Sequence, residues 1–168
     1  MQSNRGSKAD MEARLQALCD RAEITDVIHR YGRGVATGDV ELVASCFTGD
    51  AVLDMEYTVL NGGAAIRHFY AGRFGAAKDV PPAPVVLANK ISTPVMANIE
   101  IELQGDTARC ESTCLAIHAG DRDGKGMVVV RGTQNSDEFI YAGAGWKIRR
   151  RLHASKWVSE SPGQVKKH

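Results

Sequence analysis

The sequence predicts one α+β domain, in which N-terminal helices pack on a strongly curved, mixed and mainly antiparallel sheet. Three observations lead to this fold class. Apolar residues recur at helical spacing over residues 8–37, four long strand-like segments follow between residues 91 and 157, and short turn sequences separate them. The chain has 168 residues, enough for one domain whose core we expect at about residues 20–158, between polar tails.

The first segment, residues 8–37, carries two apolar stripes at helical spacing. The first stripe consists of Met11, Leu15 and Leu18, and the second of Ile24, Val27, Ile28 and Tyr31. Residues 20–21 are a candidate break between a short first helix and a longer second one. Gly38 is a stop signal, because glycine readily adopts the left-handed conformation that ends many helices. Asp39 can then cap a short helix over residues 40–47.

The strands follow the helical segment. Residues 51–59, AVLDMEYTV, read as the first strand, and an NGG turn leads to a third helix at residues 64–74. Four long strands are expected at residues 91–103, 107–118, 127–141 and 146–157. Pro94 places its part of the first long strand at a sheet edge or a bulge. A long sheet curved around helices leaves a cavity between them, which is the default place for a ligand.

Composition and charge argue against several classes of partner. The chain is 43% hydrophobic and 24% charged, with a net charge of +1 from 21 basic and 20 acidic residues, so neither nucleic acid nor a membrane surface is expected. No run of eighteen apolar residues and no apolar signal core is present, which predicts a cytoplasmic protein. The four cysteines have no zinc-site spacing, and in a cytoplasmic protein we expect them to be reduced thiols. No metal or organic cofactor is implied, because the sequence shows no residue cluster for one.

Alternation along residues 107–118 predicts one wall of the cavity. One face is small and partly polar and consists of Cys110, Ser112, Cys114, Ala116 and His118. His118 at the rim is the preferred general base, and the alternative is a histidine that only ends the strand. Arg131 follows three valines in mid-strand, where an unpaired charge is costly. It either binds a carboxylate or a carbonyl of the substrate, or pairs with Glu138 or Asp54.

Other candidate site residues come from the helix and the first strand. Asp54 is expected to face the cavity, where it could act as a base or pair with His118. Tyr31 would offer its hydroxyl to a carbonyl oxygen, and the alternative is a core tyrosine with a satisfied hydroxyl. The candidates for substrate contact are Tyr57, Met96, Asn98, Cys114 and Phe139. Tyr57, Met96 and Phe139 are equally compatible with an ordinary core position.

The outward face of the sheet is the expected interface between copies of the chain. It carries Leu115, Ile117 and Trp157 among charged residues, which predicts a homodimer, with a trimer as the alternative. His153 alternates with Ile148 and Leu152, which look core-facing. We therefore expect His153 on the outer or oligomer face.

Three segments resemble the SnoaL-like branch of the nuclear transport factor 2-like superfamily. They are AEITDVIHRYGRGVATGDVELVASCFTGDAVLDM, NIEIELQGDTARCESTCLAIH and GWKIRRRLHASKW, spread over residues 22–157. The resemblance implies a cone-shaped α+β barrel. The superfamily includes dehydratases acting on scytalone and bile acids, polyketide cyclases, ketosteroid isomerases, dioxygenase small subunits and binding proteins, so the fold alone does not select a function.

The dehydratases of this group typically use a tyrosine, an aspartate on the same helix and a histidine on a strand, and the last two exchange protons. The resemblance assigns the tyrosine to Tyr31. It assigns the aspartate position to Ala36 and, counting four residues back from Asn98, the histidine position to Pro94. Alanine and proline cannot transfer protons, so the usual dehydratase mechanism is not expected here.

Two functions therefore remain open. The first is a cofactor-independent dehydratase or isomerase that abstracts a proton next to a carbonyl of a small hydrophobic compound. His118 or Asp54 would be its base, while Tyr31 and Arg131 would stabilise the enolate. The second is a non-catalytic binding protein or subunit with the same cavity.

Overall fold

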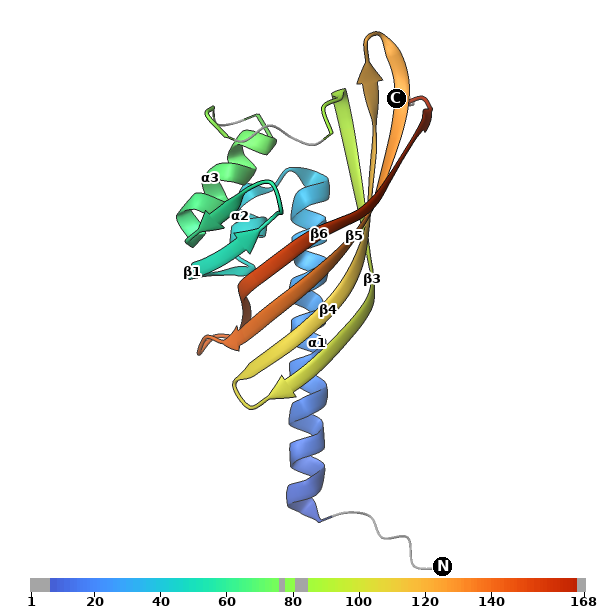
Figure 1. Cartoon of the computed structure of the whole chain (residues 1–168). Coiled ribbons are helices and arrows are strands. Elements are labelled where there is room, and N and C mark those ends of the chain that lie inside the picture. The colour runs from blue at the N-terminus through green and yellow to red at the C-terminus, as the bar shows by residue number, and fades with distance from the viewer. Residues whose placement is uncertain (1–6, 76–77, 81–84, 166–168) are drawn as a thin grey trace, which may run out of the picture.

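The computed structural model describes residues 7–75, 78–80 and 85–165, and Figure 1 shows a long helix lying across a curved sheet. In chain order the elements are α1 (Lys8–Thr37), α2 (Val40–Ala44), β1 (Phe47–Asp54), β2 (Val59–Asn61), α3 (Gly63–Arg73), β3 (Ala88–Gln104), β4 (Thr107–Arg122), β5 (Lys125–Tyr141) and β6 (Trp146–Pro162). The predicted α+β fold class is confirmed. Parts of both expected tails, residues 1–6 and 166–168, lie outside the described residues.

The sheet is mixed and has the strand order β2-β1-β6-β5-β4-β3. Strands β3 to β6 form an antiparallel meander, while β1 pairs in parallel with β6. The sheet does not close on itself, so the expected barrel is an open curved sheet with β2 and β3 at its edges. Pro94 lies in edge strand β3, as predicted, because an edge tolerates a residue without an N–H group.

Helix α1 is unbroken over 30 residues, so the candidate break is absent. At the expected break, the Asp20 carboxylate accepts a hydrogen bond from Trp146 Nε1 at 3.0 Å, which ties this part of α1 to the start of β6. The second apolar stripe is buried, whereas Met11, Leu15 and Leu18 of the first are 60%, 61% and 65% exposed. In Figure 1 this end of α1 extends past the turn between β3 and β4, which leaves the first stripe uncovered by the sheet.

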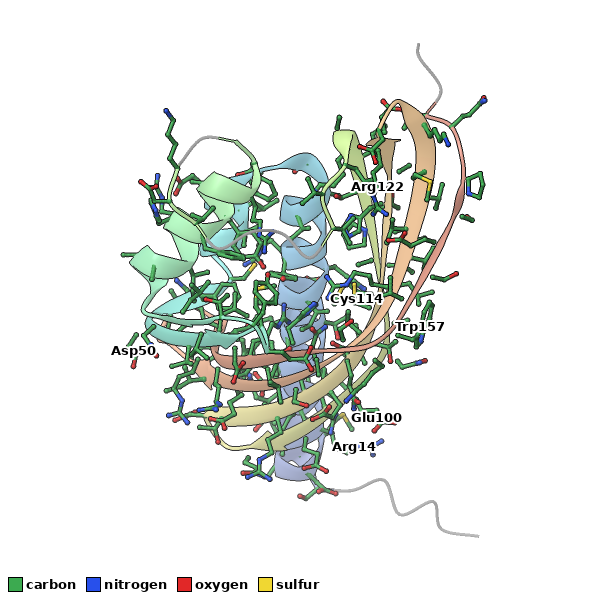
Figure 2. The ribbon with its side chains drawn as sticks, turned by 45° about the horizontal axis from the view of Figure 1, so that its top comes forward. Arg14, Asp50, Glu100, Cys114, Arg122 and Trp157 are labelled. Atoms are coloured by element: carbon green, nitrogen blue, oxygen red, sulfur yellow. The ribbon has the colours of Figure 1, made fainter. Side chains whose placement is uncertain are left out.

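The helix boundaries follow local chemistry. Gly38 ends α1 with a φ of 71°, in the left-handed region where only glycine is unstrained. Asp39 caps α2, because its Oδ1 accepts a hydrogen bond from the Leu42 N–H at 2.9 Å. Both features were predicted. The core lies between α1, α3 and the concave face of the sheet, and Figure 2 shows Cys114 on that side of the sheet and Trp157 on the other.

Strand β6 departs from simple alternation at a bulge. Ile148 pairs with Phe139 and Arg150 pairs with Glu138, so Arg149 is an extra residue on its strand. An extra residue reverses which side chains face inward for the rest of the strand.

This bulge decides where His153 lies. Arg151 and His153 turn inward and are 0% and 9% exposed, while Leu152 is 38% exposed. The prediction of an outward His153 was therefore wrong, because it assumed unbroken alternation after Ile148. A second bulge, at Lys156, returns Trp157 to the outward face, where it was expected.

Candidate functional site

A cavity of about 620 Å³ lies between the helices and the concave face of the sheet, a volume typical of small-molecule sites. Its apolar wall includes Val35, Met55, Phe69, Tyr70, Phe74, Val85, Leu87 and Ile91. Of the predicted site residues, the cavity is lined by Tyr31, Tyr57, Cys114, His118 and Arg131. Ala36 and Pro94 line it as well, so both positions matched to the family's acid and base face this cavity.

Four other predicted site residues are not among those that line this cavity. Asp54 ends β1, and its Oδ1 accepts a hydrogen bond from the Glu56 N–H at 3.0 Å. Met96 packs against the core, and Phe139 is buried within it. Asn98 is exposed beside the β3 bulge with a φ of 50°, which turns it out of the strand's inward face.

His118 reaches the cavity from β4, whose inward face follows the predicted alternation. Its Nδ1 lies 3.0 Å from Ser92 Oγ on the neighbouring strand. Burial lowers the pKa of His118, and the charges of Lys90 and Arg131 lower it further, to about 4. At neutral pH the ring is therefore uncharged and can accept a proton.

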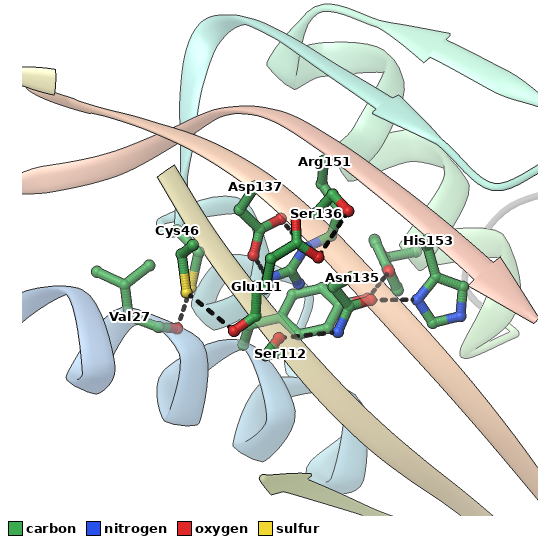
Figure 3. A network of polar contacts seen from close by, with 12 residues as sticks. Val27, Cys46, Glu111, Ser112, Asn135, Ser136, Asp137, Arg151 and His153 are labelled. Atoms are coloured by element: carbon green, nitrogen blue, oxygen red, sulfur yellow. Dashed lines mark hydrogen bonds and ion pairs between the residues drawn. The ribbon is translucent and has the colours of Figure 1, made fainter. Parts of the chain in front are cut away.

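His153 lines the same cavity from β6. Figure 3 shows its ring beside Asn135. Its Nδ1 lies 2.7 Å from Asn135 Oδ1, and Asn135 Nδ2 donates to Ser112 Oγ at 3.3 Å. An amide oxygen only accepts hydrogen bonds, so His153 Nδ1 carries the proton and Nε2 keeps its lone pair. Burial, followed by the charges of Arg151 and Arg131, lowers the pKa of His153 to about 4. The cavity thus has a second neutral histidine.

A buried ion pair supports this wall of the cavity (Figure 3). Arg151 donates two hydrogen bonds to Asp137, each 2.7 Å long, and both side chains are 0% exposed. The guanidinium carbon lies 4.2 Å from the centroid of the Tyr31 ring. Burial disfavours the charge of Arg151, but the Asp137 carboxylate more than offsets this and raises the pKa of Arg151 above its usual value. The ion pair thus holds the Arg151 guanidinium against the face of the Tyr31 ring.

Two tyrosines share a hydrogen bond at the cavity wall. The hydroxyl oxygens of Tyr31 and Tyr70 are 2.6 Å apart. Burial raises the pKa of Tyr31 and raises the pKa of Tyr70 well above its usual value, so both are protonated at neutral pH. Only one of the two protons can lie between the oxygens. The other hydroxyl proton is therefore available to an acceptor on a ligand.

Three cationic side chains line the cavity, Arg73, Lys90 and Arg131. The Arg73 guanidinium carbon lies 4.6 Å from the centroid of Phe69 and 5.6 Å from that of Tyr57, to whose hydroxyl it also donates a hydrogen bond. Partial burial, followed by the charge of Arg73, lowers the pKa of Lys90. Over the part of the chain that the structure describes, no Asp or Glu lines the cavity.

The two structural pairs considered for Arg131 do not form. Glu138 pairs instead with Arg149 at 3.2 Å, and Asp54 binds a backbone N–H group. Within the described ranges, the Arg131 side chain has no carboxylate within 4.0 Å. The alternatives that remain for it are solvent and a ligand.

Sequence reasoning missed several cavity residues, namely Tyr70, Arg73, Lys90 and His153. Tyr70 had a usable signal, because it belongs to the apolar face of the predicted third helix together with Ile66 and Phe69. No sequence signal marked His153, since it faces inward only because of the β6 bulge.

The described residues contain no group of three or more His, Cys, Asp or Glu side chains placed to hold a metal ion. No helix among them is long and apolar enough to cross a membrane. All four cysteines are free thiols, and only Cys19 is exposed. Burial raises the pKa of Cys110 to about 12, so this thiol is unreactive at neutral pH.

Comparison with known proteins agrees with the fold. An NTF2-like protein with a cystatin-like fold from Novosphingobium aromaticivorans is 24% identical, with a TM-score of 0.70 over 90% of this chain and 91% of that one. A putative scytalone dehydratase from the same organism is 18% identical, with a TM-score of 0.69 over 89% and 91%. A hexachlorocyclohexane dehydrochlorinase, LinA type 2, is 15% identical, with a TM-score of 0.72 over 92% and 97%.

At these identities the similar structures establish a shared fold and no more. No curated protein sequence matches the chain. A family model described as the SnoaL-like domain matches residues 16–152, which is most of the sequence. The protein therefore belongs to the SnoaL-like family.

Proposed function

We propose that this protein binds a small hydrophobic carbonyl compound in the cavity and removes a proton from the carbon next to the carbonyl, as a cofactor-independent dehydratase or isomerase. One observation carries the proposal. The same cavity is lined by an uncharged histidine, a hydroxyl with a proton to donate, and a guanidinium that has no carboxylate partner among the described residues. Enolate formation needs a base and stabilisation of the developing oxyanion, and the hydroxyl and the guanidinium are two groups that can stabilise it.

His118 is the proposed base. In the free protein burial, followed by the charges of Lys90 and Arg131, holds the pKa of His118 low, which keeps the ring unprotonated but makes it a weak base. As an enolate forms, its negative charge offsets the two cations and the pKa of His118 rises. Proton affinity therefore increases at the moment when the proton is transferred. Asp54 has less support as a base. It is not among the residues that line the cavity, and its Oδ1 already accepts a hydrogen bond from the Glu56 N–H group.

The developing negative charge on the carbonyl oxygen would be stabilised from two sides. Arg131 supplies a full positive charge from β5, and the Tyr31–Tyr70 pair supplies one hydroxyl proton from the helical side. The Arg151–Asp137 pair has a positioning role, because Arg151 packs under the Tyr31 ring. The dehydratase and dehydrochlorinase among the similar structures support this reaction class as an analogy of fold.

A non-catalytic binding protein is the second candidate, and a specific observation favours it. Ala36 and Pro94 both line the cavity, so the positions matched to the family's acid and base carry no titratable group. In this alternative the cavity binds a ligand without chemistry, and His118 and His153 only make polar contacts with it.

An NMR experiment in D2O distinguishes the enzyme from the non-catalytic binding protein. It monitors the exchange of the ligand's α-protons for deuterium. Aryl ketones and β-hydroxy ketones should exchange faster with the wild type than with His118→Gln, by at least about 100-fold. His68→Gln is the matched control, since His68 is exposed on α3. Binding without exchange in the wild type would favour the non-catalytic alternative. Equal exchange by His118→Gln and wild type would remove His118 as the base.

We also propose that the protein is a homodimer that pairs through the outward face of the sheet, with a trimer as the alternative. Val95, Leu115, Gly132 and Trp157 are consecutive partners across four strands on this face. The Trp157 ring lies over Gly132, whose missing side chain leaves room for it, and Trp157 is still 50% exposed. Such an apolar row is expected to meet a partner.

A further inference from the structure

We propose that the cavity's ligand carries a carboxylate, and that Arg131 is the anchor for this group. The inference rests on the proposed function only in that the cavity is a small-molecule site. With Arg131 occupied by the carboxylate, the Tyr31–Tyr70 hydroxyl would be left to stabilise the enolate oxygen. It names the substrate class: an amphipathic carboxylic acid with an aromatic or alicyclic body.

The charges around the cavity are one-sided. Arg73, Lys90 and Arg131 come from α3, β3 and β5, and no carboxylate accompanies them among the described lining residues. The stretches of sequence outside the described ranges contain no Asp or Glu. The whole chain has a net charge of only +1, so the excess of positive charge is local to the cavity. Clefts with charge of one sign concentrate ligands of the opposite sign.

Arg131 differs from the other partly or fully buried arginines of the sheet. Arg151 has Asp137 at 2.7 Å, and Arg122 has Glu160 at 2.7 Å. Arg131 is half-buried, yet its side chain has no ion-pair partner among the described residues. A cation that has lost part of its hydration is costly unless a counter-charge replaces it. A ligand carboxylate, held by the planar guanidinium fork, would be that counter-charge.

The two acidic residues that share a cavity with Arg131 each bind another group. Arg131 also lines a smaller cavity of about 370 Å³, which contains Glu56 and Glu160. Glu56 accepts a hydrogen bond from the Ser155 N–H at 2.8 Å. Glu160 uses both oxygens on Arg122, at 2.7 and 3.1 Å. Neither is within ion-pair distance of Arg131, so the guanidinium remains available to a ligand.

The rest of the cavity fits the apolar body of such a ligand. Phe69, Phe74, Met55 and Val35 provide aromatic and aliphatic surface. The field of Arg131 extends across this space, because its charge helps to lower the pKa of both His118 and His153. A carboxylate bound at Arg131 would weaken that field, so the pKa of both histidines should rise when the ligand binds.

Two probes of equal shape test the anchor: naphthalene-2-carboxylate and naphthalene-2-carboxamide, titrated calorimetrically at pH 7. The wild type should bind the carboxylate at least about tenfold more tightly than the amide, since hydrogen bonds to charged groups are the stronger class. Arg131→Gln should lower carboxylate affinity by about tenfold and amide affinity much less, because the glutamine amide can still donate a hydrogen bond to a neutral oxygen. Arg149→Gln is the matched control, because Arg149 pairs with Glu138 on the exposed face. It should leave both affinities unchanged.

The outcomes separate this inference from the proposed function. Equal affinities for the two probes in the wild type, unchanged in Arg131→Gln, would overturn the anchor and leave the small-molecule site intact. Binding of neither probe at millimolar concentration would overturn the site itself. Should Arg131→Gln fail to fold, the wild type alone decides: carboxylate affinity must fall as salt rises from 20 to 500 mM, while amide affinity stays constant. A carboxylate affinity that does not change with salt concentration would contradict the role of Arg131 as the anchor.

Discussion

Replacing Asp137 by asparagine should destabilise the protein far more than replacing its neighbour Glu138 by glutamine. The two acids are consecutive in β5, and each pairs with an arginine of β6. The Asp137–Arg151 pair is 0% exposed on both sides, whereas the side chains of Glu138 and Arg149 are 48% and 47% exposed. The comparison isolates burial, because strand, partner type and charge change are the same.

The expected magnitudes follow from that difference. Removing one partner of a buried ion pair leaves an uncompensated buried charge, at a cost of about 3–5 kcal/mol. Asparagine keeps one oxygen as an acceptor for Arg151, so the lower end, about 3 kcal/mol, is expected. Glu138→Gln should cost less than about 1 kcal/mol, as exposed pairs do. For a domain of this size the unfolding midpoint should fall by about 6–12 °C in Asp137→Asn and by less than about 4 °C in Glu138→Gln.

Urea unfolding at pH 7 measures both variants. Trp146 is buried and hydrogen-bonded to α1, so its fluorescence should report loss of the core. Similar losses of unfolding free energy in the two variants would refute the reasoning. So would a loss below about 1 kcal/mol in Asp137→Asn, since the Arg151 guanidinium would then be hydrated in the folded protein.

Four further predictions concern other parts of the molecule. The pKa of His153 is about 4 in the folded protein and 6.5 ordinarily, so the unfolded chain binds more protons between these values. Stability contributed by the neutral ring should be complete above pH 6.5 and be lost as pH falls to 4, by at most about 3 kcal/mol. A variant His153→Gln with an undiminished pH slope in urea unfolding would contradict this. All four cysteines should count as free thiols in denaturant without reductant, but only Cys19 should react in the native protein, and a lower total would reveal a disulfide. Trp157→Glu should convert the proposed dimer to a monomer in light scattering at micromolar concentration, and a monomeric wild type would count against the interface. Ala36→Asp should weaken binding of the neutral naphthalene amide by about tenfold, because a carboxylate at the cavity wall must lose water; unchanged affinity in a folded variant would mean that residue 36 does not contact the ligand.

Local sequence was sufficient wherever neighbouring residues decide the outcome. The cap at Asp39, the helix end at Gly38 and the buried second stripe of α1 were all predictable, because each depends on residues within a turn or two. The alternation along β4 was predictable for the same reason, since no bulge interrupts its pairing with β5. That alternation placed His118 on the cavity side of the sheet from sequence alone.

Tertiary structure decided what depends on register and on distant partners. The Arg149 bulge in β6 brought Arg151 and His153 inward, and a bulge of one residue leaves no mark in the hydrophobic pattern. Likewise, the exposure of Leu15 depends on where the sheet ends beside α1, although its helical spacing matches that of a buried stripe.

Some features of the candidate site were likewise predictable from the sequence, and others depended on the tertiary structure. The sequence by itself determined the α+β class, the cavity wall on β4 and the absence of an acid or base at Ala36 and Pro94. Only the folded chain decided that Arg131 has no carboxylate within 4.0 Å among the described residues, because ion pairing depends on which side chains meet across strands far apart in sequence. Asp137 and Glu138, consecutive along β5, point to opposite faces and pair with Arg151 and Arg149, so neither is a partner for Arg131.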